Sequence, residues 1–141
     1  MSASAITVVA LIVGVVLATP FLIWTRGQPD AGMRLYAVGR GVTALIYLGF
    51  ALIGGTSGSS LGLEAVGILL YGGAAWIGFR KTTVVLALGW ALHPVWDVAL
   101  HLNGAGAGYT PGWYPWGCVS FDLMVAGAVL TAARPPRRSR G

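Results

Sequence analysis

The segment Leu92–Leu102, which reads LHPVWDVALHL, places three ionisable side chains in an otherwise apolar stretch. These residues are His93, Asp97 and His101, and each follows the previous one after four positions. Side chains at this spacing share one face of a helix. Imidazoles and carboxylates transfer protons and bind metal ions, and they are costly to bury in apolar surroundings without partners. The segment therefore predicts a functional site on one face of a helix.

Two further carboxylates, Glu64 and Asp122, also lie within long apolar stretches. An ionisable side chain at the centre of a bilayer costs about 2.5–3.5 kcal/mol on insertion scales, so such residues are functional hypotheses by default. Measured along the predicted helices, Asp97, Asp122 and Glu64 lie at similar depths, about 21–25 Å from the cytoplasmic edge. We expect a single buried site in the outer half of the bilayer. Its predicted catalytic residues are Asp97, Asp122, His101, His93 and Glu64.

The first interpretation of this site is acid–base catalysis on a lipophilic small molecule. Carboxylates and imidazoles held together in an apolar site can supply both a proton donor and a proton acceptor. Further polar or aromatic side chains fall on the predicted helices and are candidates for substrate binding. These are Arg40, Tyr47, Tyr71 and Trp96.

A metal-binding protein is the second interpretation. His93 and His101 are about 12 Å apart along a helix axis, too far to bind the same ion through bonds of about 2 Å. A site built around one adjacent pair remains feasible, and its mixed nitrogen and oxygen ligands would suit zinc, iron or manganese. The ligands of this site would be His101, Asp97, Asp122 and Glu64. Cys118 is the only cysteine, which excludes an intrachain disulfide and a multi-cysteine metal site.

Two other interpretations stay open. The ladder of His93, Asp97 and His101 could relay protons or a cation through half of the membrane, as in a coupled transporter. The preceding stretch TTVVLALGWAL has no ionisable residue to continue this path. The polar groups could instead only pair with one another, but interhelical polar contacts average about 0.6 kcal/mol, which is small against the insertion cost.

The elements that must position these residues follow from the composition. Of the 141 residues, 56% are hydrophobic and 9% are charged, whereas soluble domains carry about 25% charged residues. Stretches of roughly 20 apolar residues, each enough to cross a ~30 Å hydrocarbon core, recur along the chain. With short connections between them, they predict an all-α integral membrane protein with a single domain over residues 1–141. The predicted spans are 5–24, 35–53, 61–79, 83–102 and 117–133.

Basic residues predict the orientation of this five-helix bundle. Arg26 and Arg34 flank the first connection, Arg80 and Lys81 fill the third, and the tail 134–141 is basic, while the second and fourth connections lack Lys and Arg. The positive-inside rule then predicts an outside N-terminus, a cytoplasmic C-terminus and a location in the inner (plasma) membrane. We expect the tail to contact anionic membrane lipids rather than nucleic acid, although the net charge is +5. Glycine-rich helix faces would permit a homodimer.

The fourth connection is rich in aromatic residues, with Tyr109, Trp113, Tyr114 and Trp116. Such residues are typical of the aromatic belt at a membrane interface. They could also cover a pocket that opens to the outside. Pro111, Gly112 and Pro115 favour an irregular, turn-rich loop here.

The signature HPVWDVALH, followed by FDLMVAGAVL in the last predicted helix, resembles a group of small bacterial multipass membrane proteins of uncharacterised function. The resemblance covers the last two helices best. It implies a membrane-embedded helical bundle and transfers no activity and no catalytic role.

Overall fold

The computed structural model describes residues 2–28, 31–56 and 58–132, and the regular structure within these ranges is entirely helical. Five helices are each long and apolar enough to cross a membrane, as the sequence predicts. They are α1 (Ala3–Arg26), α2 (Gly32–Ile53), α3 (Gly58–Arg80), α4 (Thr83–Asp97), which continues as a π-helical turn (Val98–Leu102), and α5 (Tyr114–Ala132). A short 3-10 turn, Ala105–Gly108, lies in the connection before α5. The basic tail 134–141 is outside the described residues.

The start of α5 differs from the prediction. The helix begins at Tyr114 rather than at Gly117, so Pro115 and Trp116 lie in its first turn and not in the preceding loop. Proline is tolerated there because the first N–H groups of a helix have no partner within the helix. The proline was therefore compatible with a helix start, and the sequence interpretation gave it too much weight as a helix breaker.

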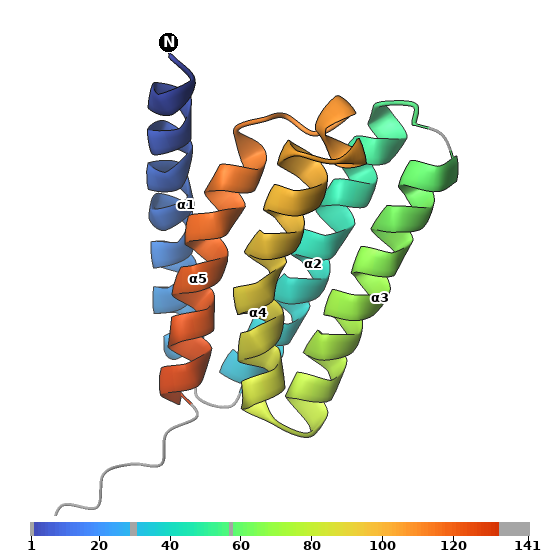
Figure 1. Cartoon of the computed structure of the whole chain (residues 1–141). Coiled ribbons are helices and arrows are strands. Elements are labelled where there is room, and N and C mark those ends of the chain that lie inside the picture. Colours follow the sequence, from blue (N-terminus) through green and yellow to red (C-terminus); the bar gives the residue numbers. More distant parts are fainter. Residues whose placement is uncertain (1, 29–30, 57, 133–141) are drawn as a thin grey trace, which may run out of the picture.

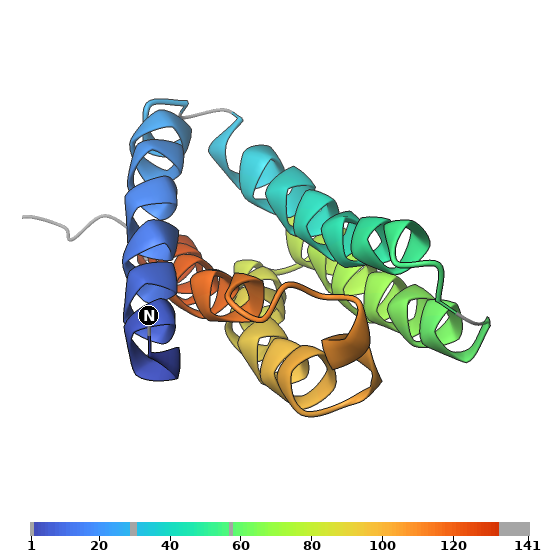
Figure 2. The same ribbon diagram turned by 90° about the horizontal axis from the view of Figure 1, so that it is seen from above.

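The helices form an up-and-down bundle with α1 at its edge (Figures 1 and 2). α1 packs mainly along α5, α5 packs along α4, and α3 packs against both α4 and α2. Between α1 and α2 the contacts are few. The position of α1 at the edge agrees with its sequence, which has no ionisable side chain before Arg26.

The two ends of the bundle differ in charge. The α1–α2 and α3–α4 connections lie at the same end, together with Arg26, Arg34, Arg80 and Lys81 (Figure 1). We call this the basic end. The α2–α3 connection and the segment between α4 and α5 lie at the opposite end, which we call the loop end.

The apolar core fills the half of the bundle nearer the basic end. Leu86 and Trp90 from α4 pack there with Val125 and Val129 from α5. Gly78 brings α3 close to α4, since a Cβ atom at this position would lie 2.6 Å from the backbone nitrogen of Leu86. The interior of the other half is where the buried ionisable side chains lie.

The helical geometry changes within the segment that carries the two histidines. Pro94 lies inside α4 and has no N–H to donate, and the α-helix gives way to a π-helical turn after Asp97. A π-helical turn is wider than an α-helical one and is frequent at functional sites. His101 lies in this turn. Its side chain therefore takes an angular position that a regular α-helix would not give it.

Candidate functional site

All five ionisable residues of the predicted site are buried. The structure divides them between two neighbouring groups, which recruit two further residues. The core cluster consists of Arg40, His93, Asp97 and Asp122. The loop cluster consists of Glu64, His101 and Tyr109.

In the core cluster, two donors converge on one oxygen of Asp122. The Nδ1 atom of His93 donates a hydrogen bond of 2.7 Å to Oδ2 of Asp122, and Nη1 of Arg40 approaches the same oxygen at 3.5 Å. Nδ1 of His93 also lies 3.3 Å from Oδ2 of Asp97. One imidazole therefore faces two carboxylates, one from its own helix and one from α5.

Arg40 is fully buried and supplies positive charge inside the bundle. Its guanidinium lies 5.0 Å from the ring centroid of Tyr71 and 5.0 Å from that of Trp90. Contacts of this kind between a guanidinium and aromatic faces are favourable and gain strength when desolvated. Trp90 was not among the predicted site residues. Its position one turn before His93, on the same helix face, was the available signal.

Several polar atoms of the core cluster have no hydrogen-bond partner among the described residues. They include both carboxylate oxygens of Asp97 and Oδ1 of Asp122. Both side chains are essentially inaccessible to solvent, Asp97 at 0% and Asp122 at 1%. Buried carboxylate oxygens are normally paired because the cost of desolvating them is high. The core cluster therefore has unused capacity to accept a proton, a hydrogen bond or a cation.

In the loop cluster, two donors also share one oxygen, and the acceptor is Glu64. Nε2 of His101 donates to Oε1 of Glu64 at 2.9 Å, and the Tyr109 hydroxyl donates to the same atom. Burial and the adjacent Glu64 carboxylate raise the pKa of Tyr109, which keeps the phenol protonated and able to donate. The sequence offered only an aromatic-rich loop here and did not single out Tyr109.

The segment that carries Tyr109 is held directly against the loop cluster. A Cβ atom at Gly106 would collide with the His101 ring and with the carbonyl oxygen of Leu100, so only glycine permits this approach. The segment between α4 and α5 therefore covers His101.

Asp97 and Tyr47 lie between the two clusters. Oδ1 of Asp97 is 3.7 Å from Nδ1 of His101. The ring of Tyr47 stacks on His101 with a centroid distance of 3.8 Å and meets His93 edge-on at 5.8 Å. Tyr47 is thus adjacent to both imidazoles. The two imidazoles hydrogen-bond to different carboxylates, His93 to Asp122 and His101 to Glu64.

Tyr71 and Trp96, the remaining predicted substrate-binding residues, differ in their proximity to the core cluster. The ring of Tyr71 lies 4.8 Å from that of His93, and its hydroxyl donates to the Leu92 carbonyl. Trp96 is half-buried, packs near Gly67 of α3 and lies 6.1 Å from the Tyr71 ring. Among the described contacts, Trp96 reaches the core cluster only through Tyr71.

The potential metal ligands differ from the predicted set. His93, Asp97 and Asp122 each offer one ligand atom, and these atoms lie within 4.8 Å of one another. The predicted set contained His101 and Glu64 instead of His93. Those two side chains hydrogen-bond to each other.

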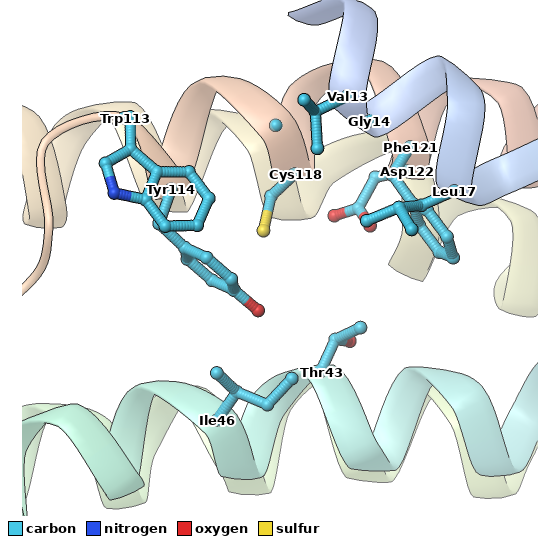
Figure 3. A pocket seen from close by; sticks show the side chains of 11 residues that line it. Val13, Gly14, Leu17, Thr43, Ile46, Trp113, Tyr114, Cys118, Phe121 and Asp122 are labelled. Atoms are coloured by element: carbon cyan, nitrogen blue, oxygen red, sulfur yellow. The ribbon is translucent and has the colours of Figure 1, made fainter. Parts of the chain in front are cut away.

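A cavity of about 210 Å³ lies between α1, α2 and α5, and Asp122 is among the residues that line it (Figure 3). Most of the lining is apolar. Polar groups reach it from Thr43 of α2 and from Tyr114, Cys118 and Asp122 of α5. A second hollow of about 320 Å³ continues between α1 and α2 and shares Thr43 and Phe121 with the first.

We call these two hollows together the α1–α2 groove. The sequence did not predict it, because its existence depends on α1 packing on α5 rather than on α2.

The chain was also compared with known proteins. No curated protein and no solved structure shows significant similarity to it. The profile of a family of unknown function, DUF6010, matches residues 5–135 and so covers all five helices and both clusters. The chain therefore belongs to the DUF6010 family of unknown function.

Proposed function

We propose that this protein is a multipass membrane enzyme that transforms a lipophilic small molecule by proton transfer at the core cluster. The observation that carries the proposal is the α1–α2 groove, whose mostly apolar lining includes Asp122. Predominantly apolar lining with a few convergent polar groups is typical of sites that bind small molecules. A lipid-soluble substrate would reach Asp122 from the bilayer, between α1 and α2.

The core cluster contains the groups that such a reaction needs. In this proposal Asp122 exchanges a proton with the substrate, and the Nδ1–H group of His93, which donates to Asp122 and faces Asp97, orients the carboxylate. Arg40 lies close enough to Asp122 to stabilise negative charge that develops on the substrate. Tyr47 and Tyr71 flank His93 and restrict its motion.

The test uses purified protein in nanodiscs, incubated with a total lipid extract and followed by mass spectrometry of the lipids. We expect the wild type to convert at least one lipophilic species. Because general acid–base groups contribute about 10²–10⁴-fold, Asp122→Asn should slow this conversion by at least about 100-fold. Identical lipid profiles with and without the wild-type protein would contradict the proposal, as would full activity of Asp122→Asn.

The role of the groove has its own test. Ile46 lines the groove from α2, whereas the adjacent Leu45 is 54% exposed and points away from the core. Ile46→Trp should obstruct the groove and slow conversion by about 100-fold through substrate misplacement. Leu45→Trp is the matched control and should retain activity. Equal loss in both variants would exclude the groove as the access route.

The placement in the membrane is part of the proposal. Arg26, Arg34, Arg80 and Lys81 gather at one end of the bundle, which supports a cytoplasmic basic end, an outside N-terminus and insertion in the plasma membrane. In a Cys118→Ser background, Thr56→Cys at the loop end should react with an impermeant maleimide on intact cells. Lys81→Cys should react only after the cells are opened. The reverse pattern would invert the orientation.

A further inference from the structure

The arrangement of ligand atoms in the core cluster suits one metal ion. His93 and Asp97 are one helical turn apart on α4, and Asp122 faces them from α5. Their ligand atoms lie within 4.8 Å of one another. Nitrogen and oxygen ligands about 2.0–2.2 Å from a shared ion lie roughly 3–4 Å apart. Small side-chain rotations therefore suffice to bring all three atoms to one ion.

The unpartnered oxygens of the cluster point to a ligand independently of that arrangement. Both oxygens of Asp97 and Oδ1 of Asp122 lack hydrogen-bond partners among the described residues, although both side chains are buried. Asp97 nevertheless directs Oδ2 to within 3.3 Å of the His93 nitrogen. A fully buried carboxylate that accepts no hydrogen bond is destabilising, whereas coordination of a cation satisfies it.

The balance of charge in the core cluster favours a cation. The carboxylates of Asp97 and Asp122 are buried there with one guanidinium, that of Arg40. With His93 neutral and both carboxylates ionised, one negative charge is left without compensation. A bound cation compensates it. A proton on His93 or on Asp97 would have the same effect, and the measurement below separates these possibilities.

We infer that His93, Asp97 and Asp122 bind one divalent transition-metal ion of the class Zn²⁺, Fe²⁺ or Mn²⁺. One imidazole and two carboxylates form a ligand set that suits these ions. Arg40 lies outside the set and donates a hydrogen bond to Oδ2 of Asp122, and hydrogen bonds to ligating carboxylates are common around metal sites.

The inference rests on the proposed function only in placing the reaction at the core cluster. It changes the roles of the residues in that cluster. A bound ion would take the position of the proton that His93 now donates to Asp122, and it would supply Lewis-acid chemistry.

The test begins with metal content and does not depend on catalysis. Purified wild-type protein is stripped with EDTA, reloaded with Zn²⁺, passed through a desalting column and analysed by mass spectrometry of the elements. We expect about one Zn²⁺ per chain, together with a raised thermal midpoint, because an ion that binds only the folded state stabilises it. A folded, monodisperse wild type that retains no stoichiometric Zn²⁺ and shows no thermal shift would overturn the inference.

Two matched pairs of variants identify the ligands. His93→Gln should lose the ion and His101→Gln should retain it, although both histidines are buried on the same helical segment. Likewise, Asp97→Asn should lose the ion and Glu64→Gln should retain it. Loss of the ion in His101→Gln and Glu64→Gln, with retention of the ion in His93→Gln, would overturn this ligand set. That result would favour the ligand set predicted from the sequence.

Spectroscopy on the wild type identifies the ligand atoms if the variants fail to fold. X-ray absorption at the zinc edge should show only nitrogen and oxygen neighbours, including one imidazole. A sulfur neighbour at about 2.3 Å would place the ion at Cys118 and overturn the inference. Zinc binding with unchanged lipid profiles would contradict the proposed enzyme alone. Lipid conversion by a protein that binds no metal ion would contradict the metal site alone.

Discussion

In the loop cluster the Glu64 carboxylate accepts hydrogen bonds from His101 and Tyr109, whereas in the core cluster Asp97 accepts none from the described residues. Both clusters combine a histidine on the α4 segment with a carboxylate on another helix. The loop cluster lies under the segment between α4 and α5, and the core cluster is enclosed by α2, α4 and α5.

The difference separates a structural role from a chemical one. A carboxylate that accepts hydrogen bonds contributes to stability and fixes the covering segment in place. A buried carboxylate that accepts none is costly and persists where function requires it. By this criterion we expect the loop cluster to hold the bundle and its cover together, and the core cluster to be the site of the chemistry proposed above.

The largest expected effect comes from removing the only buried cation of the described chain. Arg40→Met leaves Asp122 without its cationic neighbour inside the bundle. Breaking a buried ion pair by removing one partner costs about 3–5 kcal/mol, so the free energy of unfolding should fall by this amount. Unfolding in mixed micelles titrated with dodecyl sulfate measures the change.

A double variant tests the electrostatic origin of that loss. Arg40→Met combined with Asp122→Asn should be more stable than Arg40→Met alone, because the uncompensated charge is then removed as well. Arg26→Met, at the exposed basic end, is the control and should change stability by less than about 0.5 kcal/mol. A double variant no more stable than the single one would assign the loss to packing against Tyr71 and Trp90.

Neutralising one carboxylate in each cluster tests whether the two carboxylates contribute differently to stability. Glu64→Gln weakens two charge-assisted hydrogen bonds and should cost about 1–3 kcal/mol. Asp97→Asn loses no hydrogen bond and removes a buried charge, so metal-free protein should keep or gain stability. The same micelle titration in the presence of EDTA gives both values. Equal destabilisation would mean that Asp97 has a structural role like that of Glu64.

Much of the fold was predictable from composition, because an apolar stretch of about 20 residues has few alternatives to a membrane-spanning helix. The meeting of Asp97 with Asp122 followed from counting depth along antiparallel helices. The depth of a residue follows from the rise per residue, which is the same in every α-helix, and from the direction of its helix, which alternates from one span to the next.

The division into two clusters was not predictable in the same way. Even spacing of His93, Asp97 and His101 suggests one continuous face, but the π-helical turn after Asp97 directs His101 to Glu64. Tyr109 comes from an irregular segment whose path depends on tertiary contacts. The α1–α2 groove likewise depends on which neighbour α1 packs against, and the apolar surface of α1 does not specify one.

The smallest expected effect concerns the hydroxyl that ties the covering segment to the loop cluster. Tyr109→Phe removes one hydrogen bond to Glu64 and should cost about 1 kcal/mol at neutral pH. Hydrogen exchange of residues 103–112 should rise, while exchange within α5 stays unchanged, because the lost bond lies at the cover and not at the core cluster. A variant with wild-type exchange in this segment would show that Gly106 packing alone holds the cover.

The contribution of the Tyr109 hydroxyl to stability should depend on pH. Because burial and Glu64 raise the pKa of Tyr109 in the folded protein, its contribution to stability is complete below the unfolded tyrosine pKa of about 10. It declines as the pH rises from there through the folded pKa. The stability difference between wild type and Tyr109→Phe should therefore be constant at pH 7 and 9 and smaller at pH 11. A difference that stays constant to pH 11 would mean that ionisation of Tyr109 does not weaken its bond to Glu64, and that the covering segment is held in a different way from the one described.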